Sequence, residues 1–131
     1  MHITLEADYA VRIVGCLASQ AKRLDAKTIA ELTGVTLRFA LKILRKLVSS
    51  GLVKSFKGTQ GGYELAKAPV DISIKDVIET VEGKYQLSRC LSEEYDCNRA
   101  MSGICKFRHV FDEISVDVEK KLEKYTFDMF L

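Results

Sequence analysis

The chain has 131 residues, a size that suits one compact domain or one domain with a long arm. Its residues are 47% hydrophobic and 29% charged with a net charge of only +2, which excludes a disordered polyelectrolyte. No apolar run reaches the roughly 18 residues that cross a bilayer, and the N-terminus lacks a signal-peptide pattern, so we expect a cytoplasmic protein without a membrane partner.

Residues 5–20 form the first predicted helix, with Thr4 as its N-cap. Apolar residues surround most of its circumference, so we expect it to be largely buried. Asp8 and Arg12 stand one turn apart, a spacing that predicts an intrahelical ion pair. Cys16 is expected to be a small core residue.

Two further helices follow in close succession. The first is predicted to begin at Asp25 as its N-cap and to end at Gly34 in the left-handed conformation. The next covers about residues 36–50 and ends at Gly51. Its apolar residues repeat at intervals of three and four, which predicts a buried stripe. The stripe consists of Leu37, Ala40, Leu41, Leu44, Leu47 and Val48.

Residues 32–63 carry basic side chains and no acidic one. After the helix, a short strand near 52–56 and a glycine-rich tip ending at Tyr63 form a two-stranded wing. A helix after a tight turn, followed by a basic wing, is the layout of a winged helix-turn-helix that docks on duplex DNA. An ordinary solvated helix face is the alternative, but no acid in the segment balances these charges. We expect DNA contacts from Arg38, Lys42, Arg45, Lys54, Lys57, Thr59 and Gln60.

The glycine-rich tip has a second interpretation, a loop that binds nucleotide phosphates. That interpretation is weak because the tip lies between strands and lacks the Gly-Lys-Ser/Thr sequence that opens a helix in such loops. Tyr63 and Leu65 alternate with the polar Glu64, so we expect them to anchor the wing to the core.

Ser73 opens a fourth predicted helix that runs to about Val81 and stops at Gly83. After a polar loop, the last helix follows Gly103, with apolar residues close to heptad spacing. At about 20 residues, or ~30 Å, it is longer than so small a domain can cover, so we expect a homodimer; folding back on its own subunit is the alternative. The stripe comprises Ile104, Phe107, Phe111, Ile114, Val118, Leu122 and Tyr125.

These elements predict a mainly α fold with a winged helix-turn-helix domain, a small β wing and a long C-terminal dimerisation helix. We place the DNA-binding domain at residues 1–83, a cysteine-containing sensor loop at 84–102 and the dimerisation helix at 103–131.

Three of the four cysteines are clustered around this loop. Cys90, Cys97 and Cys105 are separated by six and seven residues, and His109 follows one helical turn after the last. Thiolates are the usual ligands of iron–sulfur clusters. Zinc also accepts three cysteines and a histidine, but structural zinc sites bring ligands in pairs two to four residues apart. The spacing favours a metal or cluster, with redox-active thiols, a disulfide between two of the three, or inert cysteines as alternatives.

The end of the basic helix at 47–53, the wing at 58–63 and the three-cysteine loop before a long helix together resemble the Rrf2 family of bacterial transcription regulators. Its members include iron–sulfur cluster-binding regulators of cluster assembly and of the nitric oxide response. The resemblance covers nearly the whole chain and implies that Cys90, Cys97 and Cys105 hold a 2Fe–2S or 4Fe–4S cluster with a fourth, non-cysteine ligand.

The resemblance offers two candidates for that fourth ligand. In the regulator of cluster assembly a histidine follows the last cysteine by three residues, whereas His109 follows Cys105 by four. In the nitric oxide branch the ligand is an acid in the first helix of the partner subunit, and Asp8 occupies the matching position. We therefore favour Asp8 over His109.

The resulting expectation is a homodimeric repressor, not an enzyme and without a small-molecule substrate, whose affinity for double-stranded operator DNA is set by its cluster. One alternative is a cluster-free DNA-binding regulator in which the three cysteines act as a thiol sensor. A small electron-transfer protein is a second alternative, but an acid-free basic helix and wing have no role in such a protein.

Overall fold

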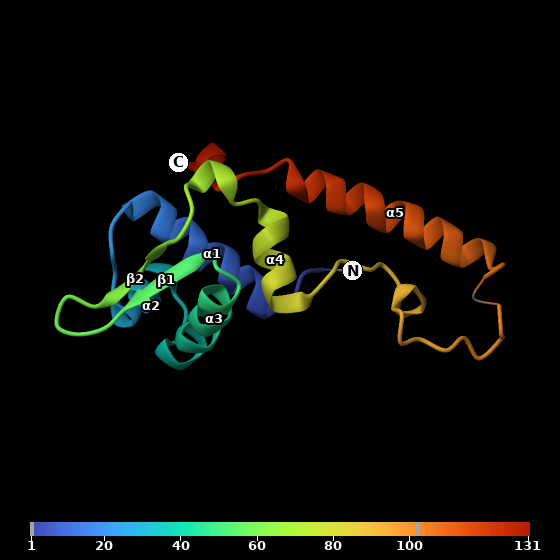
Figure 1. The fold of residues 1–131 in the computed structure, drawn as a ribbon, viewed down its shortest axis with the longest axis horizontal. Helices are drawn as coiled ribbons and strands as arrows, with labels where there is room; N and C mark the ends of the chain where they lie inside the picture. The colour runs from blue at the N-terminus through green and yellow to red at the C-terminus, as the bar shows by residue number, and fades with distance from the viewer. Residues whose placement is uncertain (1, 102) are drawn as a thin grey trace.

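A computed structural model describes residues 2–101 and 103–131 (Figure 1). It confirms a mainly helical fold with a winged helix-turn-helix unit, a small β wing and a long C-terminal helix. The helices are α1 (Leu5–Gln20), α2 (Ala26–Thr33), α3 (Leu37–Ser49), α4 (Ile74–Glu82) and α5 (Lys106–Glu123), and the wing pairs β1 (Val53–Phe56) with antiparallel β2 (Gly62–Leu65). Three short 3-10 helices are η1 (Pro69–Asp71), η2 (Arg89–Leu91) and η3 (Phe127–Phe130).

Side-chain caps explain where the helices of the winged-helix unit begin. The hydroxyl of Thr4, the carboxylate of Asp25 and the hydroxyl of Thr36 each accept a hydrogen bond from the backbone N–H three residues later. Ser73 adds a reciprocal capping box with Asp76 at the start of α4. All four caps agree with the expected helix boundaries.

The core lies where α1 packs against α2, α3 and α4. Its centre consists of fully buried aliphatic side chains: Ile13, Val14, Ile29, Ile43, Leu44, Leu47, Ile72 and Val77. Cys16 packs at the edge of this core and is only partly buried, so it is less enclosed than expected.

The wing is joined to the α1–α2 connection by backbone hydrogen bonds. The N–H of Leu24 donates to the carbonyl of Tyr63 at 2.9 Å, and the N–H of Tyr63 donates to the carbonyl of Leu24 at 2.7 Å. Gly62 allows this approach, because its φ is +143° and a Cβ there would lie 2.5 Å from the Leu24 oxygen. Tyr63 and Leu65 pack against the core, which confirms them as the anchors of the wing.

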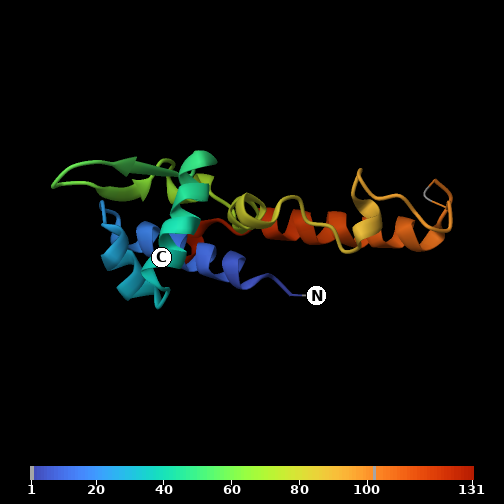
Figure 2. The ribbon, with the colours of Figure 1, turned by 90° about the horizontal axis from the view of Figure 1, so that it is seen from below.

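The long helix α5 extends away from the winged-helix unit, and residues 84–101 run alongside it (Figures 1 and 2). It begins at Lys106, slightly later than the expected start near Gly103. Near its C-terminal end, Glu119 forms an ion pair with Lys75 of α4, with 3.2 Å between the Lys75 Nζ and a Glu119 carboxylate oxygen. The chain then returns through η3, and Phe127 is buried in the winged-helix core.

None of the helices within the described residues is long and apolar enough to cross a membrane.

Candidate DNA-binding surface and cysteine segment

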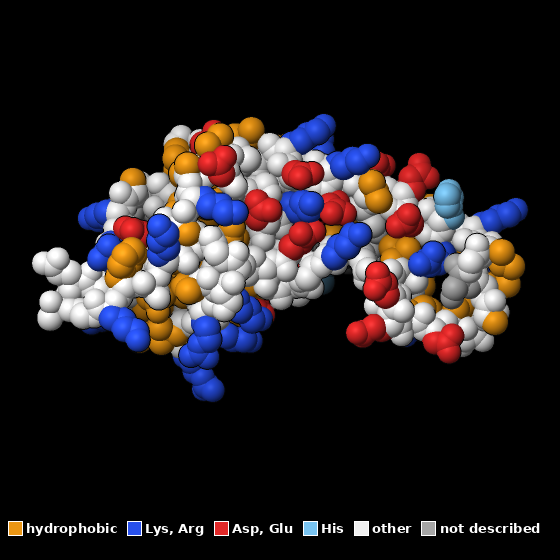
Figure 3. Space-filling model, viewed as in Figure 1, with side chains coloured by type: hydrophobic (Ala, Val, Ile, Leu, Met, Phe, Trp, Pro, Cys, Tyr) orange, Lys and Arg blue, Asp and Glu red, His pale blue; other side chains and the backbone are white. Residues whose placement is uncertain are grey.

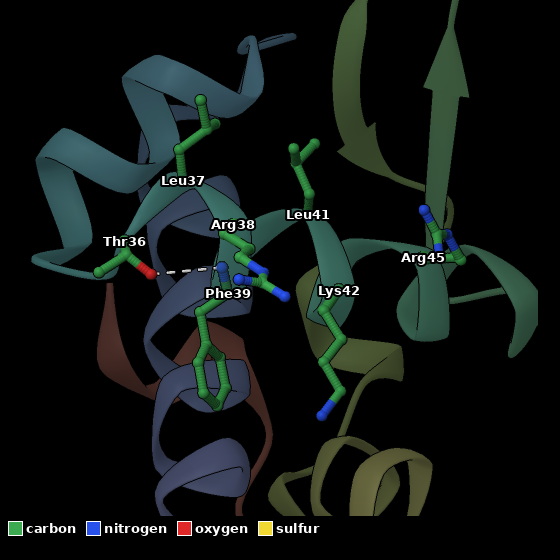
Figure 4. A pocket seen from close by; sticks show the side chains of 7 residues that line it. All are labelled: Thr36, Leu37, Arg38, Phe39, Leu41, Lys42 and Arg45. Carbon is green, nitrogen blue, oxygen red and sulfur yellow. Dashed lines mark hydrogen bonds between the residues drawn. The ribbon is translucent and has the colours of Figure 1, made fainter.

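The exposed side of α3 forms a shallow hollow with a mixed basic and apolar lining (Figure 4). Arg38, Lys42 and Arg45 are all exposed there. Basic side chains gather at the lower edge of the molecule, where α3 lies, whereas acidic and basic side chains are mixed along α5 and acidic ones lie on the connection between α4 and α5 (Figures 1 and 3). The full lining is Thr36, Leu37, Arg38, Phe39, Leu41, Lys42 and Arg45.

The expected burial of two leucines in the apolar stripe of α3 is wrong. Leu37 is 46% exposed and Leu41 is 39% exposed, whereas Ile43, outside that stripe, is fully buried. At 3.6 residues per turn, the buried side of α3 is therefore rotated by roughly 60° from the expected one. The physical reason is that contacts with α1, α2 and β1 decide which apolar side of the helix faces inward. The two leucines consequently share a side with the basic residues.

The basic charge of α3 is partly neutralised by a residue distant in the sequence. The Glu6 carboxylate on α1 lies 2.6 Å from the Lys46 Nζ and 3.9 Å from the Lys42 Nζ. Within the described part of the chain, Arg38 and Arg45 have no acidic partner at salt-bridge distance. The two arginines are therefore the more available cations of α3.

The wing presents Lys54, Lys57, Thr59 and Gln60 to solvent. Sequence reasoning missed Arg23, which holds this hairpin in place. Its guanidinium carbon lies 3.4 Å from the centroid of the Phe56 ring, its Nη1 donates to the Gln60 carbonyl at 3.1 Å and its Nη2 lies 3.8 Å from a Glu64 carboxylate oxygen. A basic residue before the second helix gives no sequence signal for this role, because the contact spans 37 positions.

Helix α1 contacts α3 through more than the core. Tyr9 packs edge-to-face on Phe39 with ring centroids 5.2 Å apart. Directly before Tyr9, Asp8 pairs with Arg12 one turn further along α1 at 2.8 Å, which confirms the expected ion pair. A ligand that binds Asp8 would therefore bind α1, the helix that packs against α3.

The segment with the three clustered cysteines is fastened to α5 by two hydrogen bonds. The Leu87 N–H donates to the buried hydroxyl of Ser115 at 2.8 Å, and the Arg108 Nε donates to the Cys90 carbonyl at 3.1 Å. Cys90 lies in η2, and Cys105 occupies the N-cap position of α5. The segment thus begins and ends on the same helix.

Cys97 and Cys105 share an environment that stabilises thiolates. Backbone N–H groups of Met101 and Arg99 hold the pKa of the Cys97 thiol below its ordinary value. Hydrogen bonding from the Arg108 backbone, at the start of α5, lowers the pKa of Cys105. The Arg99 Nη2 also donates to the Cys105 Sγ at 3.7 Å.

The donor chemistry of this segment fits an iron–sulfur cluster, because such clusters are held by thiolates. The side chains are not gathered into a complete ligand set, however. Among residues 2–101 and 103–131, no group of three or more Cys, His, Asp or Glu side chains is arranged to hold a metal ion. All four cysteines are free thiols. Of the two candidates for a fourth ligand, His109 is exposed on the first turns of α5 and Asp8 lies in the winged-helix unit.

We expect the metal-free protein to show a pH-dependent order of thiol alkylation. Cys97 and Cys105, whose pKa values are lowered, should react with iodoacetamide at lower pH than Cys16, whose pKa is raised by burial. The sign follows because the thiolate is the nucleophile and a lower pKa leaves more of it at a given pH. Peptide mass spectrometry after pulses between pH 6 and 9 would measure the order. The same pulses in urea are the control, and an order that persists in urea would contradict this explanation.

Comparisons with known proteins agree with the fold. The sequence profile of Rrf2, described as an iron-dependent transcriptional regulator, matches residues 3–131. The chain is 30% identical over 128 residues to the HTH-type transcriptional regulator NsrR of Halalkalibacterium halodurans, covering 96% of this chain and 87% of the relative.

Two solved structures are also similar. IscR of T. potens superposes with a TM-score of 0.76 and 27% identity, covering 98% of this chain and 84% of that one. CymR, the global cysteine regulator of B. subtilis, superposes with a TM-score of 0.76, covering 98% of this chain and 94% of that one. Its identity is 24%, so this likeness concerns the fold alone.

Proposed function

The chain belongs to the Rrf2 family of transcriptional regulators, and from this membership we propose that it is a homodimeric repressor whose operator affinity depends on an iron–sulfur cluster. Family membership implies DNA binding. The cluster, the dimer and the contacting residues are our proposals.

We assign DNA contact to α3 and the wing. Arg38 and Arg45 are exposed cations with no acidic partner at salt-bridge distance among the residues that the structure describes, and α3 lies at the lower edge of the winged-helix unit in Figure 1. The wing adds Lys54 and Lys57 beside it. Recognition helices of this class meet base edges with their N-terminal half, so Arg38 and Lys42 are our candidates for base contacts. The wing cations, with Thr59 and Gln60 at its tip, would contact the phosphate backbone.

The single observation that supports the sensor is a pair of thiols, Cys97 in the segment before α5 and Cys105 at the N-cap of that helix. The lowered pKa of Cys97 and of Cys105 favours the thiolate form that ligates iron. We propose that Cys90, Cys97 and Cys105 are the thiolate ligands, with Asp8 of the partner subunit as the fourth. When bound, a cluster supplies iron that exchanges electrons and reacts with small oxidants or nitric oxide.

The same observation favours a second candidate, a cluster-free thiol sensor. A thiol of lowered pKa beside a guanidinium is also the environment of an oxidisable cysteine. In that case oxidation of Cys97 or Cys105 would change DNA affinity without any metal.

Purification without oxygen distinguishes the two candidates. We expect a brown protein with visible absorption that is lost in the Cys90→Ser, Cys97→Ser and Cys105→Ser variants but kept in Cys16→Ser, the matched control. Gel shifts on a DNA duplex selected by the protein should show operator affinity changing with the loss of colour. A colourless protein, with iron absent after anaerobic reconstitution and DNA binding that responds to peroxide, would overturn the cluster and support the thiol sensor.

A further inference from the structure

Two leucines of α3 that were expected in the core are instead exposed on the surface of the protein. Leu37 and Leu41 are one helical turn apart, and their side chains point the same way into the hollow (Figure 4). The core beneath does not need them, because Ala40, Ile43 and Leu44 are fully buried. The leucines are therefore available to something outside the protein.

The surroundings of the leucines restrict what that can be. Arg38, Lys42 and Arg45 line the same hollow, and the two arginines have no acidic partner among the residues that the structure describes. A ligand that fits must carry negative charge around an apolar group. A single exposed leucine is ordinary, but an exposed apolar pair that shares its hollow with three cations favours a ligand that is both apolar and negatively charged.

Duplex DNA supplies this combination in its major groove. Phosphates line the rim of the groove, and the C5-methyl of thymine is the apolar group that base edges present on its floor. A leucine side chain has no donor or acceptor, so it distinguishes thymine from cytosine by the methyl group.

We propose that Leu37 and Leu41 recognise thymine methyl groups in the operator, while the surrounding cations contact phosphates and guanines. This inference rests on the proposed docking of α3 in the major groove. It makes the two leucines specificity-determining residues and predicts thymines at fixed positions in each half-site.

The test begins with the full-length protein and a pool of random duplexes, from which it selects its own operator. Each thymine of that operator is then replaced by uracil, which lacks only the methyl group. We expect at least one position per half-site where uracil weakens binding about fourfold per methyl group lost, the size expected for one buried methyl or methylene. The measurement is competition gel shift at fixed salt.

The protein variants make the assignment specific. At the thymine that the replaced leucine contacts, the Leu41→Ala or Leu37→Ala protein should bind the thymine and uracil duplexes equally, because the contact with that methyl group is already lost. Val116→Ala, an exposed apolar residue on α5, is the matched control and should retain the discrimination.

Two outcomes would overturn the inference. In the first, the protein selects an operator but tolerates uracil at every thymine, which leaves groove docking intact. In the second, the leucine variants weaken binding yet still discriminate thymine from uracil, which indicates a structural role. Failure to select any duplex would instead refute the proposed function itself, and the inference with it.

Discussion

Replacing Ile114 with Glu should convert the protein into monomers and weaken operator binding by about 100-fold or more, the lower end of what a second binding module contributes. Ile114 is 39% exposed on α5, and Phe107, two turns earlier on the same side, is 66% exposed. A helix of 18 residues, about 27 Å long, leaves these side chains uncovered in one subunit. A second copy of α5 is the occupant that we propose.

The physical reason for the large effect is that a carboxylate in an apolar interface must be desolvated without a partner. The loss of operator affinity follows because a dimer presents two recognition helices about 34 Å apart to successive major grooves, and a monomer presents one. The Phe107→Glu variant should behave in the same way. Sedimentation velocity and gel shift on one operator duplex measure both effects.

Val116→Glu provides the matched control. Val116 is 38% exposed, nearly the same as Ile114, but lies about half a turn away on the opposite side of α5. It introduces the same charge on the same helix without entering the proposed interface. If the Ile114→Glu and Phe107→Glu variants remain dimers, the result would support the alternative in which α5 packs only on its own subunit.

Local signals in the sequence were sufficient to place the helix ends. Thr4 and Asp25 cap as expected, and Thr36 and Ser73 cap the helices that were expected to begin at those residues. A cap requires only an oxygen and a backbone N–H three residues away. Glycine in the left-handed region at Gly34 is equally local. Such features depend on neighbours in the chain and are therefore visible in one sequence.

The orientation of α3 could not be predicted in the same way. Eight of its thirteen residues are apolar, so the helix has apolar side chains around much of its circumference. Which of them face inward depends on where α1 and α2 lie, and that is settled by tertiary packing. The consequence was an incorrect assignment of Leu37 and Leu41 to the core. These are the residues that we propose to contact thymine.

Contacts between distant positions were the other part that sequence reasoning missed. Glu6 neutralises Lys46 across 40 positions, and Arg23 holds the wing through Gln60 across 37. Charged residues in loops and helices have many possible partners, and spacing does not choose among them. The cysteines show the same limit, because their spacing indicates thiolate chemistry but not how the segment closes around a ligand.

The fourth ligand of the proposed cluster should have a large effect on the response of operator affinity to the cluster, because it decides whether the cluster contacts the DNA-binding unit. We expect Asp8→Ala to change the visible spectrum of anaerobically reconstituted protein and to abolish the response of operator affinity to the cluster. His109→Ala should keep both. The reason is that Asp8 lies on α1, whose Tyr9 and Glu6 contact Phe39 and Lys46 of α3. His109 lies on α5 with its backbone bonded to Cys105, so it could order only its own segment.

Arg12→Ala is the control that separates ligation from stability. It removes the same Asp8–Arg12 ion pair but leaves the carboxylate in place. Because both side chains are nearly half exposed, losing the pair itself should lower the free energy of unfolding by less than about 0.5 kcal/mol. Arg12→Ala also removes the contacts of the guanidinium with the Tyr9 ring and the Thr33 carbonyl, so it should be no more stable than Asp8→Ala. A spectrum altered only in Asp8→Ala is the expected result. If His109→Ala loses the spectrum and the DNA response while Asp8→Ala keeps them, the ligand is His109. Coupling would then have to run through α5, since an effector shifts a conformational equilibrium only through contacts that differ between the two states.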